Sequence, residues 1–132
     1  MNVGLDTSVL LRLLIGRPPD QATSAVNFLD DVRRTGGKVC ISDLVVAETY
    51  YALHYHYGIT KADAIAGLAN LLSTGAINAI GHAGRVLAQP GLATAKPGFV
   101  DRLIHAAYAA SEGHMATFEK AAGKLPNVIV LK

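Results

Sequence analysis

The sequence predicts an α/β fold, a three-layer α/β/α arrangement around a central parallel sheet of about four to five short strands. Two observations lead to this prediction. The chain has 132 residues, which is the length of one domain, so we expect residues 1–132 to fold as a single unit. Short continuous apolar runs, typical of strands buried on both faces, alternate with segments of helical periodicity. Such alternation is typical of parallel sheets covered by helices.

The first half of the chain shows two strand and helix units. Residues 3–5 form an apolar run that ends at Asp6, and residues 8–14 are expected to be helical. Residues 20–34 place apolar side chains on one helical stripe, between a Pro-Pro and a Gly-Gly pair. Residues 39–41 predict a buried strand, after which Asp43 is expected to cap a helix that runs to about Tyr57.

The second half continues the alternation. Thr60 and Asp63 match a capping box, which predicts a helix to about residue 73. A weak strand is expected over residues 76–80, a short helix over 82–87 and a loop rich in Pro and Gly over 89–98. Residues 99–111 predict a further helix, and residues 115–118 and 128–131 predict the last two strands.

Composition narrows the class of protein. Hydrophobic residues make up 51% of the chain and the mean hydropathy is +0.31, which argues against disorder. The single cysteine, Cys40, excludes an intrachain disulfide and favours the reducing cytoplasm. Asp6 and Arg12 interrupt the first apolar stretch, so we expect no secretory signal. No segment approaches about 18 consecutive apolar residues, so we expect no membrane span. A net charge of +2 permits nucleic acid as a ligand.

Four carboxylates stand in apolar or small surroundings, in the segments GLDTSVLL, VVAETYYAL, GFVDRLIHAA and MATFEKAA. They are Asp6, Glu48, Asp101 and Glu119, out of only 10 acidic residues in the chain. Asp6 and Glu119 each follow a predicted strand, Asp101 opens a helix, and Glu48 is expected on an apolar, inward-facing helical stripe. Because ligands bind beyond the carboxyl ends of parallel strands, all four are expected at one edge of the sheet.

The residue type suggests the chemistry. Mg²⁺ and Mn²⁺ prefer carboxylate and water oxygens, and two such ions can activate a water and stabilise a leaving oxygen in phosphodiester cleavage. Without a cation the four acids would repel one another and a phosphate. Ordinary structural roles remain open for single residues, since Asp6 and Asp101 could be helix-terminal acids and Glu119 could open a short helix. Zinc is rejected, because no His or Cys residues have zinc-site spacing.

In order and over nearly the whole chain, these four segments resemble the PIN domain, and more closely the VapC-type toxins of bacterial toxin–antitoxin pairs. The resemblance implies a metal-dependent endoribonuclease that a cognate antitoxin protein holds inactive. It implies that Asp6, Glu48 and Asp101 are the principal metal-binding acids. Glu119 stands where the family usually has aspartate, so its role as a ligand is the least secure of the four.

The resemblance also suggests supporting residues. Thr7, Ser8 and Thr117 match a family habit of placing hydroxyls beside these acids, where they could orient a carboxylate or merely cap a helix. Basic residues could contact RNA phosphates or be ordinary solvated charges, and the two directly beside the acids, Arg102 and Lys120, are the better candidates for RNA contacts. The candidates are Arg102, Lys120 and Arg12. A cluster of tyrosines over residues 50–57 could stack on bases but is better explained by core or dimer packing.

Two other functions remain as alternatives. Asp6 could be the covalent nucleophile of a phosphatase, although the second aspartate expected two residues later is absent. The chain could also be a decayed module that binds RNA or a protein without cleaving it. The apolar excess further predicts a homodimer face and a groove for the antitoxin.

Overall fold

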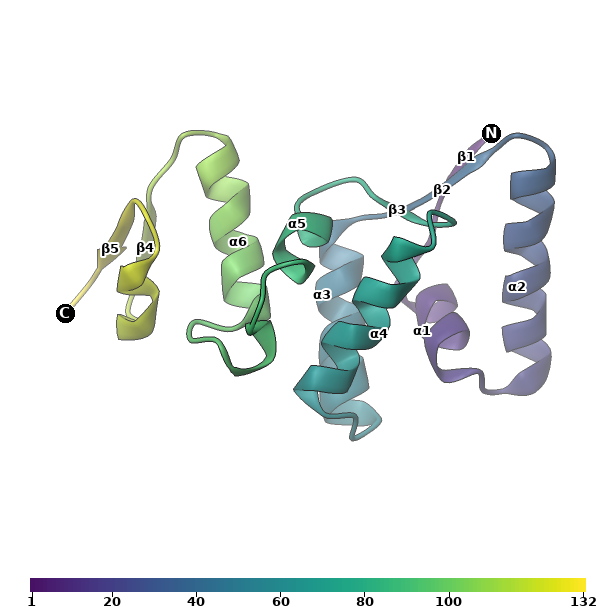
Figure 1. Ribbon diagram of the computed structural model, residues 1–132, viewed down its shortest axis with the longest axis horizontal. Coiled ribbons are helices and arrows are strands. Elements are labelled where there is room, and N and C mark those ends of the chain that lie inside the picture. The colour runs from purple at the N-terminus through teal and green to yellow at the C-terminus, as the bar shows by residue number, and fades with distance from the viewer.

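Strands and helices alternate along the chain, and every strand pair is parallel, as the sequence predicts. The computed structural model describes all 132 residues (Figure 1). The first half contains β1 (Asn2–Gly4), α1 (Thr7–Ile15), α2 (Pro19–Arg34), β2 (Lys38–Ile41), α3 (Asp43–Tyr51) and a π-helical turn (Ala52–His56). The second half contains α4 (Lys61–Ser73), β3 (Asn78–Ala79), α5 (Ala83–Leu87), a 3₁₀ turn (Leu92–Thr94), α6 (Phe99–Ala110), β4 (Met115–Thr117), a 3₁₀ turn (Lys120–Lys124) and β5 (Val128–Val130).

The five strands form two separate sheets. One has the order β1-β2-β3, with Val3 opposite Val39 and Cys40 opposite Asn78. The other consists of β4 and β5, with Ala116 opposite Ile129. The number of strands and their parallel direction agree with the prediction, whereas the division into two sheets was not predicted.

Local signals account for the first helices. The Asp6 side chain caps α1 by accepting hydrogen bonds from the backbone N–H groups of Ser8 and Val9. Gly16 ends this helix with a φ of 76°, a left-handed conformation that favours glycine. Helix α2 begins at Pro19, where a missing backbone N–H costs nothing because the first helical N–H groups lack partners in any case.

The expectation that Asp43 caps the helix after β2 is wrong. Ser42 is the N-cap, and its hydroxyl accepts from the backbone N–H of Val45 at 3.2 Å. The Asp43 carboxylate instead accepts from the backbone N–H groups of His82 and Ala83, each at 2.9 Å, at the start of α5. A side chain 39 residues away in the sequence therefore ties α3 to α5.

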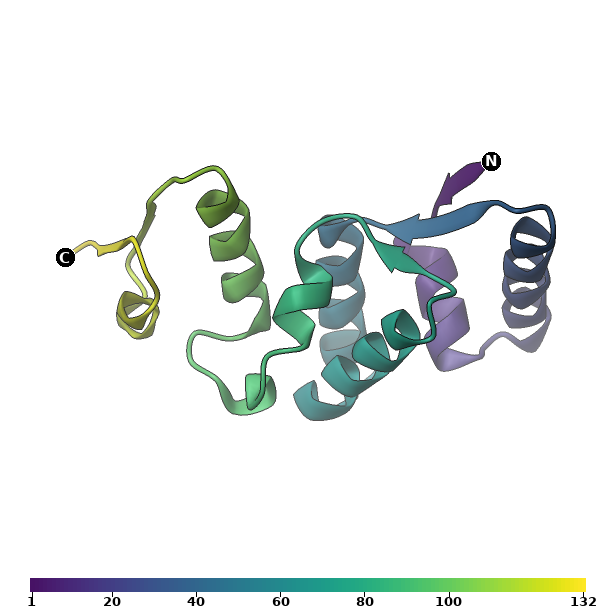
Figure 2. The ribbon, with the colours of Figure 1, turned by 45° about the horizontal axis from the view of Figure 1, so that its top comes forward.

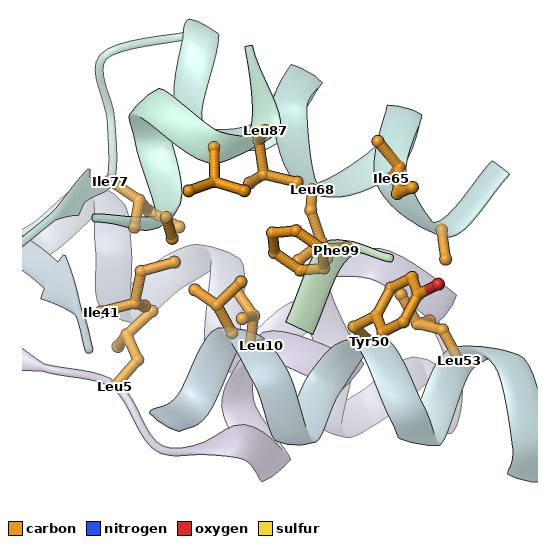
Figure 3. Close-up of a cluster of buried hydrophobic side chains, with 14 of the residues drawn as sticks. Leu5, Leu10, Ile41, Tyr50, Leu53, Ile65, Leu68, Ile77, Leu87 and Phe99 are labelled. Atoms are coloured by element: carbon orange, nitrogen blue, oxygen red, sulfur yellow. The ribbon is translucent and has the colours of Figure 1, made fainter. Parts of the chain in front are cut away.

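The main hydrophobic core lies between the β1-β2-β3 sheet and helices α1 to α5 (Figure 3). Val39, Ile41 and Ile77 contribute side chains from the strand segments, and each is at most 1% exposed. Leu10 and Leu68 reach the same core from α1 and α4. Burial of these side chains is the main stabilising contribution to this part of the fold.

Helix α6 joins the second sheet to this core. Phe99 and Leu103, near its start, are buried in the main core, and the Phe99 ring meets the Tyr50 ring edge-on with centroids 5.1 Å apart. In both Figure 1 and Figure 2, α6 stands between α5 and the β4-β5 pair, so the molecule is elongated. The C-terminus lies at one end of the long axis, and α2 forms the other end, beyond the N-terminus.

No helix of the structure combines the length and the apolar character needed to cross a lipid bilayer.

Candidate active site

Asp6 lies two residues after β1, at the carboxyl end of the strand, and its side chain is exposed. Its Oδ1 atom accepts a hydrogen bond from the Ser8 hydroxyl at 2.6 Å and from the Ser8 backbone N–H at 3.0 Å. These bonds, the hydroxyl first, together with the Val9 backbone N–H, hold the pKa of Asp6 below its usual value. The carboxylate is therefore ionised and fixed in orientation at the edge of the sheet.

Glu48 is held beside this position by Thr7. The Thr7 hydroxyl donates a hydrogen bond to Glu48 Oε1 at 3.1 Å, which joins α1 to α3 across the end of the strands. Thr7 directly follows Asp6 in the chain, so two of the predicted acids lie in one neighbourhood. The hydroxyls of Thr7 and Ser8 thus orient carboxylates, which is one of the two roles expected for them.

The expectation that Glu48 lies on an inward-facing stripe is wrong. Glu48 is exposed, and so are its helical neighbours Leu44 and Tyr51, which are 72% and 46% exposed. The buried side of α3 carries Val46 and Tyr50 instead. Apolar residues surround α3 on all sides, so periodicity alone selected the wrong face.

Asp101 and Glu119 form a second acidic pair. Asp101 lies in the first turn of α6, and Glu119 lies two residues after β4, with both side chains exposed. The Thr117 hydroxyl accepts a hydrogen bond from the Glu119 backbone N–H at 3.0 Å, so Thr117 shapes the turn that presents this acid. Both carboxylates line a depression of about 220 Å³ between α6 and β4, together with Ile104 and Tyr108.

The same two acids also border a larger groove of about 450 Å³. Its other walls come from the segment over residues 93–100, from Lys61 and from the tyrosines Tyr50, Tyr51 and Tyr55. Burial raises the pKa of the Tyr51 hydroxyl, and the nearby charge of Asp101 raises it further. The groove therefore combines carboxylates, aromatic rings and two lysines, Lys61 and Lys96.

The single chain brings the four predicted acids together as two pairs. Asp6 and Glu48 share the end of β1, whereas Asp101 and Glu119 share the groove beside α6. No three His, Cys, Asp or Glu side chains lie close enough to hold one metal ion. The donor chemistry nevertheless fits a hard divalent cation, since Asp6 and Glu48 offer exposed carboxylate oxygens steadied by hydroxyls.

The three predicted basic residues differ in their surroundings. Lys120 is exposed directly after Glu119. Arg102 is half-buried, and its Nε atom donates to the carbonyl oxygen of Pro97 at 2.7 Å, which ties α6 to the groove wall. Arg12 is half-buried on α1, donates to Gln21 of α2 and lines a depression with Ser8, but it does not line the groove of Asp101.

Sequence reasoning missed Lys61 as a groove residue. Lys61 is the first residue of α4 and stands in a capping segment, which gives no local sign of function. It reaches the groove because α4 packs against the 3₁₀ turn at residues 92–94, a contact between distant parts of the chain.

Comparison with known proteins agrees with the architecture. A model of the PIN domain family matches residues 3–125, which is most of the chain. Searches of curated proteins and of solved structures found no match. PIN domains are generally nucleases that use divalent metal ions, and the parallel strands and covering helices confirm the expected three-layer α/β class. The protein belongs to the PIN domain family.

Proposed function

We propose that this PIN domain, taken as one unit over residues 1–132, is a Mg²⁺- or Mn²⁺-dependent endoribonuclease and the toxin of a toxin–antitoxin pair in the cytoplasm. The observation that carries the proposal is the proximity of Asp6 and Glu48, because Thr7, the residue after Asp6, donates its hydroxyl to Glu48 Oε1 at 3.1 Å. This pair stands at the carboxyl end of β1 in a chain that matches a nuclease family. Ligands of open parallel sheets bind at such ends.

Each acid has a defined part in the proposed reaction. A divalent ion, when bound, lowers the pKa of a bound water and neutralises charge on the phosphate. Asp6 and Glu48 would hold it, with Asp101 as the third principal ligand and Glu119 as a further carboxylate that acts directly or through water. Ser8 keeps Asp6 ionised and oriented, since its hydroxyl bonds Oδ1 at 2.6 Å.

The groove beside Asp101 offers a route for single-stranded RNA. Tyr51 and Tyr55 are 46% and 72% exposed, and aromatic faces stack on unpaired bases. Lys61 lies in the same groove, and Lys120 follows Glu119, so both can neutralise phosphates. Of the basic residues predicted from the sequence, Lys120 suits this role best, with Arg102 as a support of the groove wall and Arg12 outside the groove.

The proposed partners are a cognate antitoxin and a second copy of the chain. Several elements expose large apolar side chains, among them Leu44, Tyr55 and Phe118, which such partners would cover. An antitoxin segment that carries Arg or Lys could occupy the acidic groove and block RNA.

One observation favours a second candidate, a module that binds RNA or a protein without cleaving it. The four acids stand as two pairs, and no three of them can hold an ion within the single chain. A decayed site would behave in this way. Cleavage assays separate the two candidates.

The test is cleavage of a labelled RNA by purified protein freed of any antitoxin. We expect cleavage with Mg²⁺ or Mn²⁺, none with EDTA, and loss of at least about 100-fold of the rate in Asp6→Asn, because the ion loses a charged ligand. Asp63→Asn, an exposed acid outside the site, is the matched control and should cleave normally. Tight RNA binding with no turnover under any divalent ion would favour the binding module. Cleavage that resists EDTA would overturn the proposal.

A further inference from the structure

Each of the two sheets has two edge strands without a partner, and β1 and β4 are one edge of each sheet. On β1, the Met1 carbonyl and the Leu5 N–H bond to β2, so the backbone groups of the alternate residues Asn2 and Gly4 point away from the sheet. On β4, the Met115 N–H and the Thr117 carbonyl bond to β5, so the backbone groups of Ala116 point away. Unpaired strand edges of this kind are templates for a further strand.

The free groups of the two edges are complementary in one parallel register. If Ala116 lies opposite Val3, its N–H can donate to the Asn2 carbonyl, and its carbonyl can accept from the Gly4 N–H. This register pairs all three residues of β1 with all three of β4. Asp6 and Glu119 each lie two residues beyond their strand, so the register sets them side by side, at the strand spacing of about 4.8 Å.

The second sheet also exposes apolar side chains to solvent. Phe118, Ile129 and Leu131 lie on one face of the β4-β5 pair and are 73%, 50% and 44% exposed. In the register above, Phe118 comes beside Leu5 and continues the apolar face that Val3 and Leu5 belong to. The occupant of the β4 edge is thus a parallel strand with an apolar face, which describes β1.

Pairing β4 with the β1 strand of the same chain would require α6 to leave its place. Helix α6 stands between β4 and the helices that flank β1 in both views (Figures 1 and 2). Only residues 111–114 connect α6 to β4, and four residues span at most roughly 14 Å. Moving α6 as well would uncover Phe99 and Leu103, which are buried in the main core. The partner strand therefore comes from a second copy.

We propose that two copies of the chain pair reciprocally, β4 of each with β1 of the other. Each copy then completes a five-stranded parallel sheet in the order β3-β2-β1-β4-β5. Each end of the dimer carries Asp6 and Glu48 from one copy and Glu119 from the other, with Asp101 beside that Glu119. The strand pairing stands on the backbone geometry alone, whereas the catalytic role of the shared site rests on the proposed function.

The strand pairing is tested without any activity. In a Cys40→Ser background, chains with Val3→Cys are mixed with chains with Ala116→Cys, refolded together and oxidised. Directly opposed strand residues lie within the Cα separation of about 4.4–6.8 Å that a disulfide spans. We expect a covalent dimer of the mixed chains on a non-reducing denaturing gel. The matched control, Ser73→Cys mixed with Ala116→Cys, should stay monomeric because Ser73 is exposed on α4, away from β1.

A chain that carries both Val3→Cys and Ala116→Cys distinguishes pairing of β1 with β4 between two copies from pairing within one chain. Pairing between copies links it into a covalent dimer. A covalently closed monomer, or a monomeric mass by light scattering at micromolar concentration, would overturn the proposal.

The shared site is tested by complementation. Asp6→Asn and Asp101→Asn chains, each inactive alone, are unfolded together in equal amounts and refolded. Half of the dimers are then mixed, and each mixed dimer has one site with all its acids, so we expect about a quarter of the wild-type cleavage rate. No recovery would overturn the shared site. An inactive wild-type protein would instead overturn the proposed function, and the cysteine test would still decide the pairing.

Discussion

Asp43 provides a sharp test of the fold, because its carboxylate and Gly81 depend on each other. The carboxylate accepts from the backbone N–H groups of His82 and Ala83 at 2.9 Å, and a Cβ at Gly81 would lie 2.5 Å from the same carboxyl group. Asp43→Ala removes these bonds to a charged acceptor at the start of α5. We expect it to lower the free energy of unfolding by about 2–3 kcal/mol, in the range of lost helix caps and charged hydrogen bonds.

Gly81→Ala should have a similar effect for a different reason. Its Cβ would overlap the Asp43 carboxylate and displace it, and such overpacking costs about 1–3 kcal/mol. In the double variant the overlapping atoms are gone, so Gly81→Ala should add little. The double variant is therefore expected at about 2–3 kcal/mol rather than the sum of about 3–6 kcal/mol.

Wild type, Asp43→Ala, Gly81→Ala and the double variant form a double-mutant cycle. Urea unfolding followed by circular dichroism, at one fixed protein concentration, measures the free energy of unfolding of each of the four proteins. Asp63→Ala is the matched control, an exposed acid in the first turn of α4 whose carboxylate makes no hydrogen bond, and should cost only a few tenths of a kcal/mol. Losses that add within about 0.5 kcal/mol would refute the reasoning, since independent sites behave in that way.

Two further substitutions test the core and the site. Phe99→Ala should lower the free energy of unfolding by about 3–5 kcal/mol, because the ring is 2% exposed and packs against Tyr50; urea unfolding measures the loss. Ser8→Ala should raise the pKa of Asp6 toward its usual value, since the Ser8 hydroxyl is the largest cause of its lowering. Because the pKa of Asp6 is lower in the folded than in the unfolded state, its ionised carboxylate stabilises the fold at pH values above the unfolded-state pKa. This stabilisation is lost as the pH falls through the folded-state pKa, so Ser8→Ala should move the loss to higher pH.

Carboxyl carbon chemical shifts from NMR give the pKa of Asp6 in both proteins. Thr7→Ala is the control for the titration, because Thr7 bonds Glu48 and not Asp6. An unchanged Asp6 pKa in Ser8→Ala would contradict the assignment of the hydroxyl bond. For Phe99→Ala, the control is Ile104→Ala, which truncates a 46% exposed side chain of the same helix.

The order of strands and helices was predictable because the signals are local. Continuous apolar runs marked the strands, and proline, glycine and capping residues marked helix ends such as Pro19 and Gly16. Strand pairing has no such signal, because nothing in a three-residue apolar run names its neighbour. The separation of the β4-β5 pair from β1 follows from the place of α6, which depends on the burial of Phe99 and Leu103.

The candidate site was likewise predictable from the sequence only in part. Asp6 was predictable at the end of β1, since a strand end and a helix cap are both visible in the sequence. The orientation of Glu48 was not, because α3 is apolar on every side and only the packing of Val46 and Tyr50 chose the buried face. The expected role of Asp43 as the cap of α3 was also wrong, because its carboxylate accepts a hydrogen bond from the backbone 39 residues away, a contact that no local pattern reveals.

The arrangement of the acids gives the proposed dimer an energetic basis. Four carboxylates in one cluster repel each other, and the single chain avoids this cost by keeping Asp6 with Glu48 and Asp101 with Glu119. Pairing β1 with β4 of another copy would unite the two sets and incur the repulsion. An ion that binds the united set and neither pair alone would stabilise the dimer by about 2.7 kcal/mol for each of its two sites at a concentration 100 times its dissociation constant. The charge that opposes strand pairing without an ion would thus favour it with one, so metal binding and assembly of the site would be the same event.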